Sequence, residues 1–180
     1  MTGLSNAEAS LLGLLSEGPM YPYQIEQEVE CRSMRDWTEL SMSAIYKLLI
    51  SLEGRGFVRR TNEVSAQNRL RKRYEITDEG TAALCKTLEA LLSVPQHTLW
   101  QVDIGTYNCD LLPKKTVLRS LKKYRKSLED GIKCYEELHK YLEDCGCPAH
   151  RFGIATRNIF LLKGEIAWVD SYMKDLGRKE

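Results

Sequence analysis

Apolar side chains recur at helical spacing in several separate stretches of this 180-residue chain. A first helix is predicted after the capping box Ser5 to Glu8, in which a hydroxyl and a carboxylate bind each other's free backbone N–H groups. Pro22 suits the first turn of a second helix, after which Trp37 is expected to fold back on the core. A third helix is predicted from Ser41, because its apolar residues follow the i, i+3, i+4, i+7 rule. These residues are Ile45, Leu48, Leu49 and Leu52.

Two short runs with strand character follow the third helix, at 57–64 and 70–77. In the second run Tyr74 and Ile76 alternate with charged residues, so one face is expected to pack and the other to be wet. Thr77 is a good cap for a fourth helix. A helix followed by a two-stranded ribbon is the order of a winged helix-turn-helix, a fold that reads DNA with one helix in the major groove. The expected core side of the fourth helix is Leu84, Leu88, Leu91 and Leu92.

The C-terminal half is predicted to be a helical arm. A helix of about thirty residues is expected to begin at Pro113, and a last helix follows the Cys145–Pro148 stop. Apolar residues of the last helix alternate in steps of three and four, which is typical of coiled-coil packing within a chain or between chains. The predicted fold is mainly α with a small β wing: a winged-helix domain at 1–94 and a dimerisation arm at 95–180. The interface between two chains is predicted at Phe152, Ile159, Leu162, Ile166, Val169 and Met173.

Charge is concentrated rather than abundant. The net charge is only +1, but residues 55–73 contain seven basic residues against one acid, Glu63. With few counter-charges nearby, this stretch is expected to attract phosphates. No signal peptide and no run of about 18 apolar residues is present, so a cytoplasmic protein without membrane spans, with its six cysteines reduced, is expected.

Small hydroxyls and basic residues are the candidate DNA contacts. Hydroxyls and N–H groups at a helix start suit phosphates and base edges, whereas an ordinary capped surface helix is the alternative for the third helix. Basic residues of the hairpin would neutralise phosphates or reach the minor groove, whereas a solvated charge run is the alternative there. The predicted contacts are Ser41, Ser43, Tyr46 and Lys47 on the third helix, and Arg69, Arg71 and Lys72 at the wing.

Several motifs in this order resemble the PadR family of bacterial transcriptional regulators over residues 9–84. They are Gly18-Pro19-Met20-Tyr21-Pro22-Tyr23-Gln24-Ile25, Ser41-Met42-Ser43-Ala44-Ile45-Tyr46 and Arg71-Lys72-Arg73-Tyr74-Glu75-Ile76-Thr77-Asp78-Glu79-Gly80. Lys47 stands where that family commonly has proline, and it adds positive charge to the face predicted to meet DNA. The arm has the length found in the short-tailed branch of the family.

The resemblance implies a homodimeric repressor that releases double-stranded DNA when a small, often aromatic compound binds between the DNA-binding domain and the arm. Aromatic residues of the arm are the candidate effector contacts, although filling a core or an interface is the commoner role for each of them taken singly. They are Trp100, Tyr107, Tyr124 and Trp168.

Other functions are weighed against this one. A winged helix can also be a protein-binding platform, and Cys145, Cys147 and His150 are a weak candidate for a soft-metal or thiol-sensing site. No cofactor or resident metal is expected. An enzyme is disfavoured, because the chain has three histidines and no phosphate loop, nucleophile elbow or metal-hydrolase motif.

Overall fold

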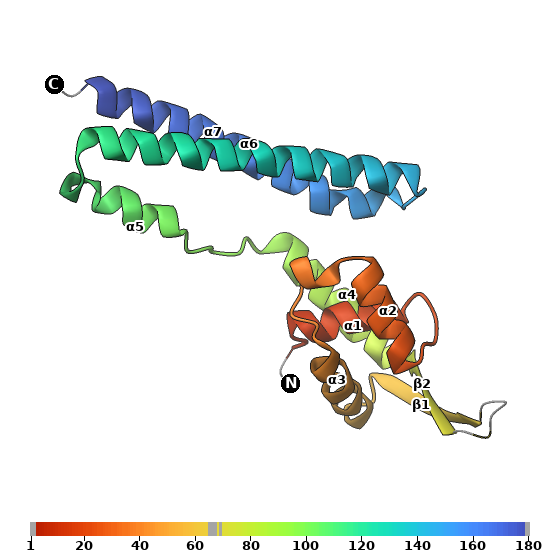
Figure 1. Ribbon diagram of the computed structural model, residues 1–180. Helices are drawn as coiled ribbons and strands as arrows, with labels where there is room; N and C mark the ends of the chain where they lie inside the picture. The colour runs from red at the N-terminus through yellow and green to blue at the C-terminus, as the bar shows by residue number, and fades with distance from the viewer. Residues whose placement is uncertain (1–2, 65–67, 69, 179–180) are drawn as a thin grey trace. The chain divides into compact units, whose positions relative to one another are not determined.

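The computed structural model describes residues 3–64, 68 and 70–178 (Figure 1). It divides into two compact units, residues 1–97 and 98–180, which are described separately below. Most described residues are helical, and the two-stranded antiparallel sheet lies in the first unit. This confirms the predicted fold, which is mainly α with a small β wing. No helix among the described residues is both long enough and apolar enough to cross a membrane.

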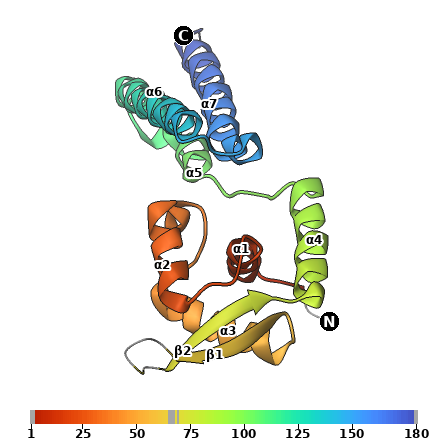
Figure 2. The same ribbon diagram turned by 90° about the vertical axis from the view of Figure 1, so that its right-hand side faces the viewer.

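The N-terminal unit has the order of a winged helix. In Figure 2, α1 lies between α2 and α4, while α3 and the hairpin lie together on one side of α1. The strands pair in an antiparallel register that runs from Val58 opposite Ile76 to Val64 opposite Leu70. The elements are α1 (Asn6–Leu15), α2 (Pro22–Cys31), the 3₁₀ turn η1 (Met34–Asp36), α3 (Met42–Gly54), β1 (Val58–Val64), β2 (Leu70–Ile76) and α4 (Asp78–Ser93).

One apolar core joins these elements. Leu12, Ile25 and Leu52, from the three N-terminal helices, have no exposed surface, and Val58 and Tyr74 bring the two strands into the same cluster. Each fully buried Leu or Ile contributes about 1.5–3 kcal/mol of transfer free energy. The core thereby fixes the orientation of α3, because the side that carries its leucines must face inward.

Helix caps set two junctions of this unit. The predicted capping box is present: the Ser5 hydroxyl accepts a hydrogen bond from the Glu8 backbone N–H at 3.2 Å, and the Glu8 carboxylate accepts one from the Ser5 N–H at 2.8 Å. At the start of α4, the Thr77 hydroxyl accepts from the Gly80 N–H at 3.0 Å. Gly80 lies so close to the preceding chain that a Cβ on it would be 2.1 Å from the Phe57 carbonyl oxygen. Glycine is therefore required where α4 passes the end of α3.

Two expectations for this unit are wrong. Leu88, Leu91 and Leu92 do not line the core, because the buried residues of α4, Gly80 and Leu84, both lie in its first two turns. Trp37 does not fold back on the core either, and half of its side chain is exposed. In both cases no other element of the unit packs against these apolar side chains closely enough to bury them.

The C-terminal unit is a long helical hairpin preceded by a short helix. The helices α6 and α7 run antiparallel side by side and are joined by the turn at Cys145–Pro148 (Figure 1). Val117, Leu121 and Leu128 of α6 pack with Val169 of α7. The elements are α5 (Gln101–Tyr107), the 3₁₀ turn η2 (Cys109–Leu111), α6 (Lys114–Asp144), the 3₁₀ turn η3 (Ala149–Phe152) and α7 (Gly153–Arg178).

Candidate nucleic-acid interface

The first turn of α3 is closed by two serines. Ser41 is the N-cap, and its hydroxyl accepts a hydrogen bond from the Ala44 N–H at 3.2 Å. The Ser43 hydroxyl lies 3.3 Å from the Ser41 hydroxyl, and both side chains are exposed. A capped helix start presents backbone N–H groups and hydroxyls to solvent, an arrangement that can bind a phosphate.

The outward side of α3 carries the remaining predicted contacts. Ile45 and Leu49 are buried against the core, so Tyr46, Lys47 and Ile50 are turned to solvent, with Tyr46 53% exposed and Ile50 66% exposed. The structure therefore brings Ser41, Ser43, Tyr46 and Lys47 together on one exposed stretch of helix. Within the described part of the chain, Lys47 makes no ion pair.

Four arginines of the basic stretch form ion pairs, three of them with acids outside the stretch and Arg73 with Glu63 inside it. Arg59 pairs with Glu75 at 2.7 Å, and this hydrogen bond raises the pKa of Arg59. The other pairs are Arg55 with Glu8 at 2.8 Å, Arg60 with Glu53 at 3.2 Å and Arg73 with Glu63 at 3.5 Å. The expectation of few counter-charges is therefore wrong for these four arginines.

The cations left over lie towards the tip of the hairpin. Arg71 stands opposite Glu63 in the strand register, and Lys72 stands opposite Asn62. The Arg71 guanidinium lies 5.9 Å from the centre of the Tyr21 ring, within cation–π range. Among the described residues, Arg71 and Lys72 form no ion pair. The predicted contact Arg69 lies outside the described residues.

A tie between α2 and the wing escapes sequence reasoning. The Tyr21 hydroxyl donates a hydrogen bond to the Glu63 carboxylate, and this bond lowers the pKa of Glu63. Next to it, Met20 and Tyr74 exchange two backbone hydrogen bonds of 2.9 Å, which extend the sheet by one bridge. The hairpin is thus held against the start of α2. No spacing rule links Tyr21 to Glu63, so only the structure could reveal the pair.

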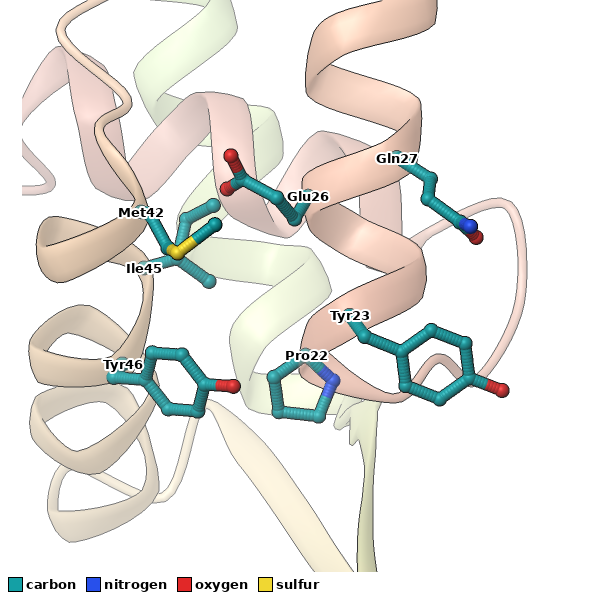
Figure 3. Close-up of a pocket in the computed structure, with 7 residues that line it drawn as sticks. All are labelled: Pro22, Tyr23, Glu26, Gln27, Met42, Ile45 and Tyr46. Atoms are coloured by element: carbon teal, nitrogen blue, oxygen red, sulfur yellow. The ribbon is translucent and has the colours of Figure 1, made fainter.

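A small pocket lies between α2 and α3 (Figure 3). Its volume is about 200 Å³, below the ~300–1,000 Å³ typical of small-molecule clefts. The Glu26 carboxylate lies between the helices, where one oxygen pairs with Arg35 and the other has no hydrogen-bond partner among the described residues. Pro22, Met42 and Tyr46 line the same pocket. We interpret it as a packing defect at the helix-turn-helix.

The predicted effector residues fall into two pairs in the C-terminal unit. Tyr124 lines a cavity between α5, α6 and α7, and Trp168 stacks on Tyr172 of the same cavity with ring centres 5.5 Å apart. Trp100 and Tyr107 are exposed, the latter by 87%. The structure therefore brings Tyr124 and Trp168 towards one site, and it leaves the other two side chains on the surface of this unit.

The residues predicted at an interface between chains pack largely within one chain. Val169 has no exposed surface, and Leu162, Ile166 and Met173 pack around the same cluster. Phe152 and Ile159 are half-buried, and the Phe152 ring meets His139 edge-on at 5.1 Å. The heptad pattern therefore serves the packing of α7 on α6, one of the two arrangements that it allowed. The apolar side chains that α7 leaves exposed are Ile154, Phe160 and Leu161.

The cysteine and histidine candidates do not assemble into a ligand set. Cys145 and His150 are exposed and Cys147 is half-buried at the turn between α6 and α7. No group of three or more His, Cys, Asp or Glu side chains among the described residues is arranged to hold a metal ion.

Comparison with known proteins finds one family model and several solved structures that resemble this chain. Residues 11–86 match the model of the "Transcriptional regulator PadR-like family". No curated protein sequence matches the chain. Among solved structures, PadR of Bacillus subtilis in complex with operator DNA has a TM-score of 0.76 at 17% identity, covering 94% of this chain and 98% of that one.

Two further structures agree over nearly the whole length. The complex of Bacillus subtilis PadR with p-coumaric acid has a TM-score of 0.78 at 17% identity and covers 96% of both chains. The PadR-like transcriptional regulator BC1756 from Bacillus cereus has a TM-score of 0.60 at 19% identity and covers 97% of this chain and 99% of that one. The residues that match the PadR-like family model, 11–86, include α3 and the wing, and this chain is similar there to transcriptional regulators of that family.

Proposed function

We propose that the protein is a homodimeric, sequence-specific repressor that binds double-stranded DNA. The observation that carries this proposal is the exposed side of α3 with Ser43, Tyr46 and Lys47, which forms no ion pair with the residues that the structure describes, in a domain that matches a family of transcriptional regulators. Its relative from Bacillus subtilis is known in complex with operator DNA. A regulator of this kind is not an enzyme, and it acts in the cytoplasm.

The proposed docking has two parts. Ser43, Tyr46 and Lys47 of α3 would meet base edges and phosphates in the major groove, with the capped helix start at Ser41 against the backbone. The hairpin would carry Arg71 and Lys72, together with Arg69, to phosphates beside that groove. The paired arginines at the base of the hairpin would then hold its shape instead of binding DNA.

Dimerisation would place two such surfaces on one duplex. In helix-turn-helix dimers the half-sites lie one helical turn apart, about 34–36 Å or 10–10.5 base pairs. We propose that a second copy covers apolar side chains which the arm leaves exposed, among them Phe160 and Leu161 of α7. An isologous contact of this kind gives the two-fold symmetry that a palindromic site requires.

The DNA-binding proposal is tested by selecting duplexes from a random library with the full-length protein and measuring the affinity of variants for the selected site. Lys47→Ala should weaken binding by about 5- to 150-fold, as expected for a lost contact worth about 1–3 kcal/mol. The double variant Arg71→Ala/Lys72→Ala should weaken binding to all sequences and lower the slope of affinity against salt by about one to two.

Lys86→Ala, which removes an exposed charge from α4, is the matched control and should leave affinity unchanged. If no palindromic sequence is enriched, or if the Lys47 and wing variants bind as tightly as the wild type, the proposed docking is wrong. Binding of an acidic protein partner at the same residues would instead support the alternative of a protein-interaction module.

We further propose that a small aromatic effector relieves repression. Support comes from the relative whose structure holds p-coumaric acid, from Tyr124 in the lining of the arm's cavity, and from Trp168, which stacks on the lining residue Tyr172. Titration of aromatic compounds against the preformed DNA complex tests this, because release should follow ligand occupancy. A complex that stays intact at full occupancy would contradict effector control.

A further inference from the structure

The C-terminal unit contains a cavity that lies wholly within one chain. It is lined by α5, the η2 segment, α6 and Tyr172 of α7, and its volume is about 340 Å³. This is at the lower end of the ~300–1,000 Å³ that small-molecule clefts occupy. Most of the lining is apolar, including Val102, Leu112, Val117 and Leu121. A cavity of this size and composition suits one or two aromatic rings.

The polar groups of the cavity carry no positive charge. Gln101, Thr106, Cys109, Ser120 and the two tyrosines are neutral, and no lysine, arginine or histidine lines the cavity. The Glu165 carboxylate accepts a hydrogen bond of 3.1 Å from the hydroxyl of the lining residue Tyr124. Burial raises the pKa of Tyr124, and the carboxylates of Glu165 and Asp103 raise it further. The field at the Tyr124 oxygen is therefore negative.

The hydrogen bonds of the cavity also favour a ligand that donates a hydrogen bond over one that carries a negative charge. Because Tyr124 gives its only proton to Glu165, its oxygen can only accept a hydrogen bond from a ligand. The Tyr172 hydroxyl and the Cys109 thiol lie 3.3 Å apart and share one hydrogen bond, in which either of them can be the donor. A ligand with an O–H or N–H group meets an acceptor at Tyr124. A carboxylate is acceptor-only, and no cationic side chain lines the cavity to pair with it, so moving it into this largely apolar site is costly even where Gln101 or Ser120 donates to it.

We propose that this cavity binds a small aromatic compound that is uncharged or cationic and donates a hydrogen bond to Tyr124, and that it rejects aromatic carboxylates. This inference deepens the proposed effector response and rests on it for its biological use. It sets this chain apart from the relative that is known with p-coumaric acid, a carboxylic acid. Glu165 is then a specificity determinant, because its charge both fixes the Tyr124 proton and repels anions.

The test compares two probes of matched size, 2-naphthol and 2-naphthoate, by calorimetric titration of the full-length protein without DNA. The naphthol should bind at least tenfold more tightly than the naphthoate. Tyr124→Phe should weaken naphthol binding at least fivefold while leaving the circular dichroism spectrum unchanged. Glu165→Gln should narrow the gap between the two probes by strengthening naphthoate binding. If Glu165 only supported the structure, its replacement would not strengthen the binding of naphthoate.

A cavity-filling variant locates the site. Gly105 lines the cavity, and a Cβ there would have no atom within 4 Å, so Gly105→Leu should add a side chain at the cavity wall without a backbone clash and weaken naphthol binding. Gly177→Leu, at an exposed position of α7 with equal room, is the matched control and should bind normally. Naphthoate binding as tight as naphthol, no naphthol binding, or naphthol binding that Gly105→Leu leaves unchanged would each overturn the inference. Because no DNA is present, such a failure is separate from a failure of DNA binding.

Discussion

The two units of the chain bury their apolar side chains to very different extents. In the N-terminal unit a single cluster of 15 buried residues draws on every helix and both strands. In the C-terminal unit the cluster has four, Val117, Leu121, Leu128 and Val169, although its helices are much longer. Two helices side by side have only one shared face, so they cannot enclose a core. The winged helix therefore encloses a core of its own, whereas the two long helices of the arm bury only the face that they share.

Exposed apolar side chains occur on both units. Phe160 is 76% exposed and Leu161 43% exposed on α7, and in the first unit Ile50 of α3 and Leu92 of α4 are exposed as well. Exposed apolar side chains that adjoin one another can mark an interaction surface. The two units therefore differ in the size of their cores, and the proposed dimer contact rests on the adjacent residues Phe160 and Leu161 of α7.

The largest expected effect is on stability, and it compares a buried and an exposed residue of the same helix, α3. Leu49 is 1% exposed on α3, whereas its neighbour Ile50 is turned to solvent. Leu49→Ala should lower the free energy of unfolding by about 2–5 kcal/mol, because it leaves a cavity in the core. Ile50→Ala should change it by less than about 0.5 kcal/mol. Urea denaturation of both variants checks this, and equal losses would mean that α3 is not oriented as described.

A second effect concerns the close approach at Gly80. The Cβ of Gly80→Ala would collide with the Phe57 backbone, which cannot move aside as a flexible side chain can. We expect a loss of about 1–3 kcal/mol, or more if the start of α4 must shift. Gly13→Ala, on α1 with no atom within 4 Å of the new Cβ, should be neutral or slightly stabilising in the same denaturation measurement. Loss of stability in the Gly13 variant alone would contradict the packing.

A third variant tests whether a second copy of the chain packs against the exposed apolar side chains of α7. Phe160→Asp places a charge on the exposed apolar side of α7 and should raise the dimer dissociation constant at least tenfold, because an unpaired charge would be buried at the contact. Lys163→Asp, at an exposed polar position of the same helix, is the control. Sedimentation velocity over a range of concentrations measures both. A Phe160 variant that dimerises like the wild type would move the contact to another face.

The smallest effect tests the cap of the N-terminal unit. Ser5→Ala removes the hydroxyl that accepts from the Glu8 N–H, and it should cost about 1 kcal/mol. Asn6→Ala, at the first helical residue, should cost less. Thermal unfolding of the two variants under one buffer separates them, and a larger loss for Asn6→Ala would count against the capping box.

Sequence patterns predicted the fold well where local rules decide. The capping box at Ser5, the helix begun by Ser41 and the antiparallel hairpin all rest on short spacings, and all are present. Patterns failed where a partner lies far along the chain. Leu92 has core spacing but no surface to pack against in its unit, and Arg55 is paired by Glu8, 47 residues away.

In the candidate site, too, local features could be predicted from the sequence, and contacts between distant elements could not. The first turn of α3 could be read from its residue types, because a serine cap and a basic residue are local signals. The Tyr21–Glu63 tie and the cavity beside Tyr124 depend on how separate elements meet, which one sequence does not encode in any spacing. From the sequence, Arg59 and Lys72 are equally good candidates for binding a phosphate. The structure distinguishes them, because Arg59 forms an ion pair with Glu75.

The central claim is that two chains, joined through their arms, present two copies of α3 to one duplex. Sedimentation equilibrium of the protein alone and bound to its selected duplex measures this directly. We predict a particle of twice the 20.7 kDa chain mass in solution and two chains on each duplex. A stable 20.7 kDa monomer that binds a single half-site with full affinity would contradict the account.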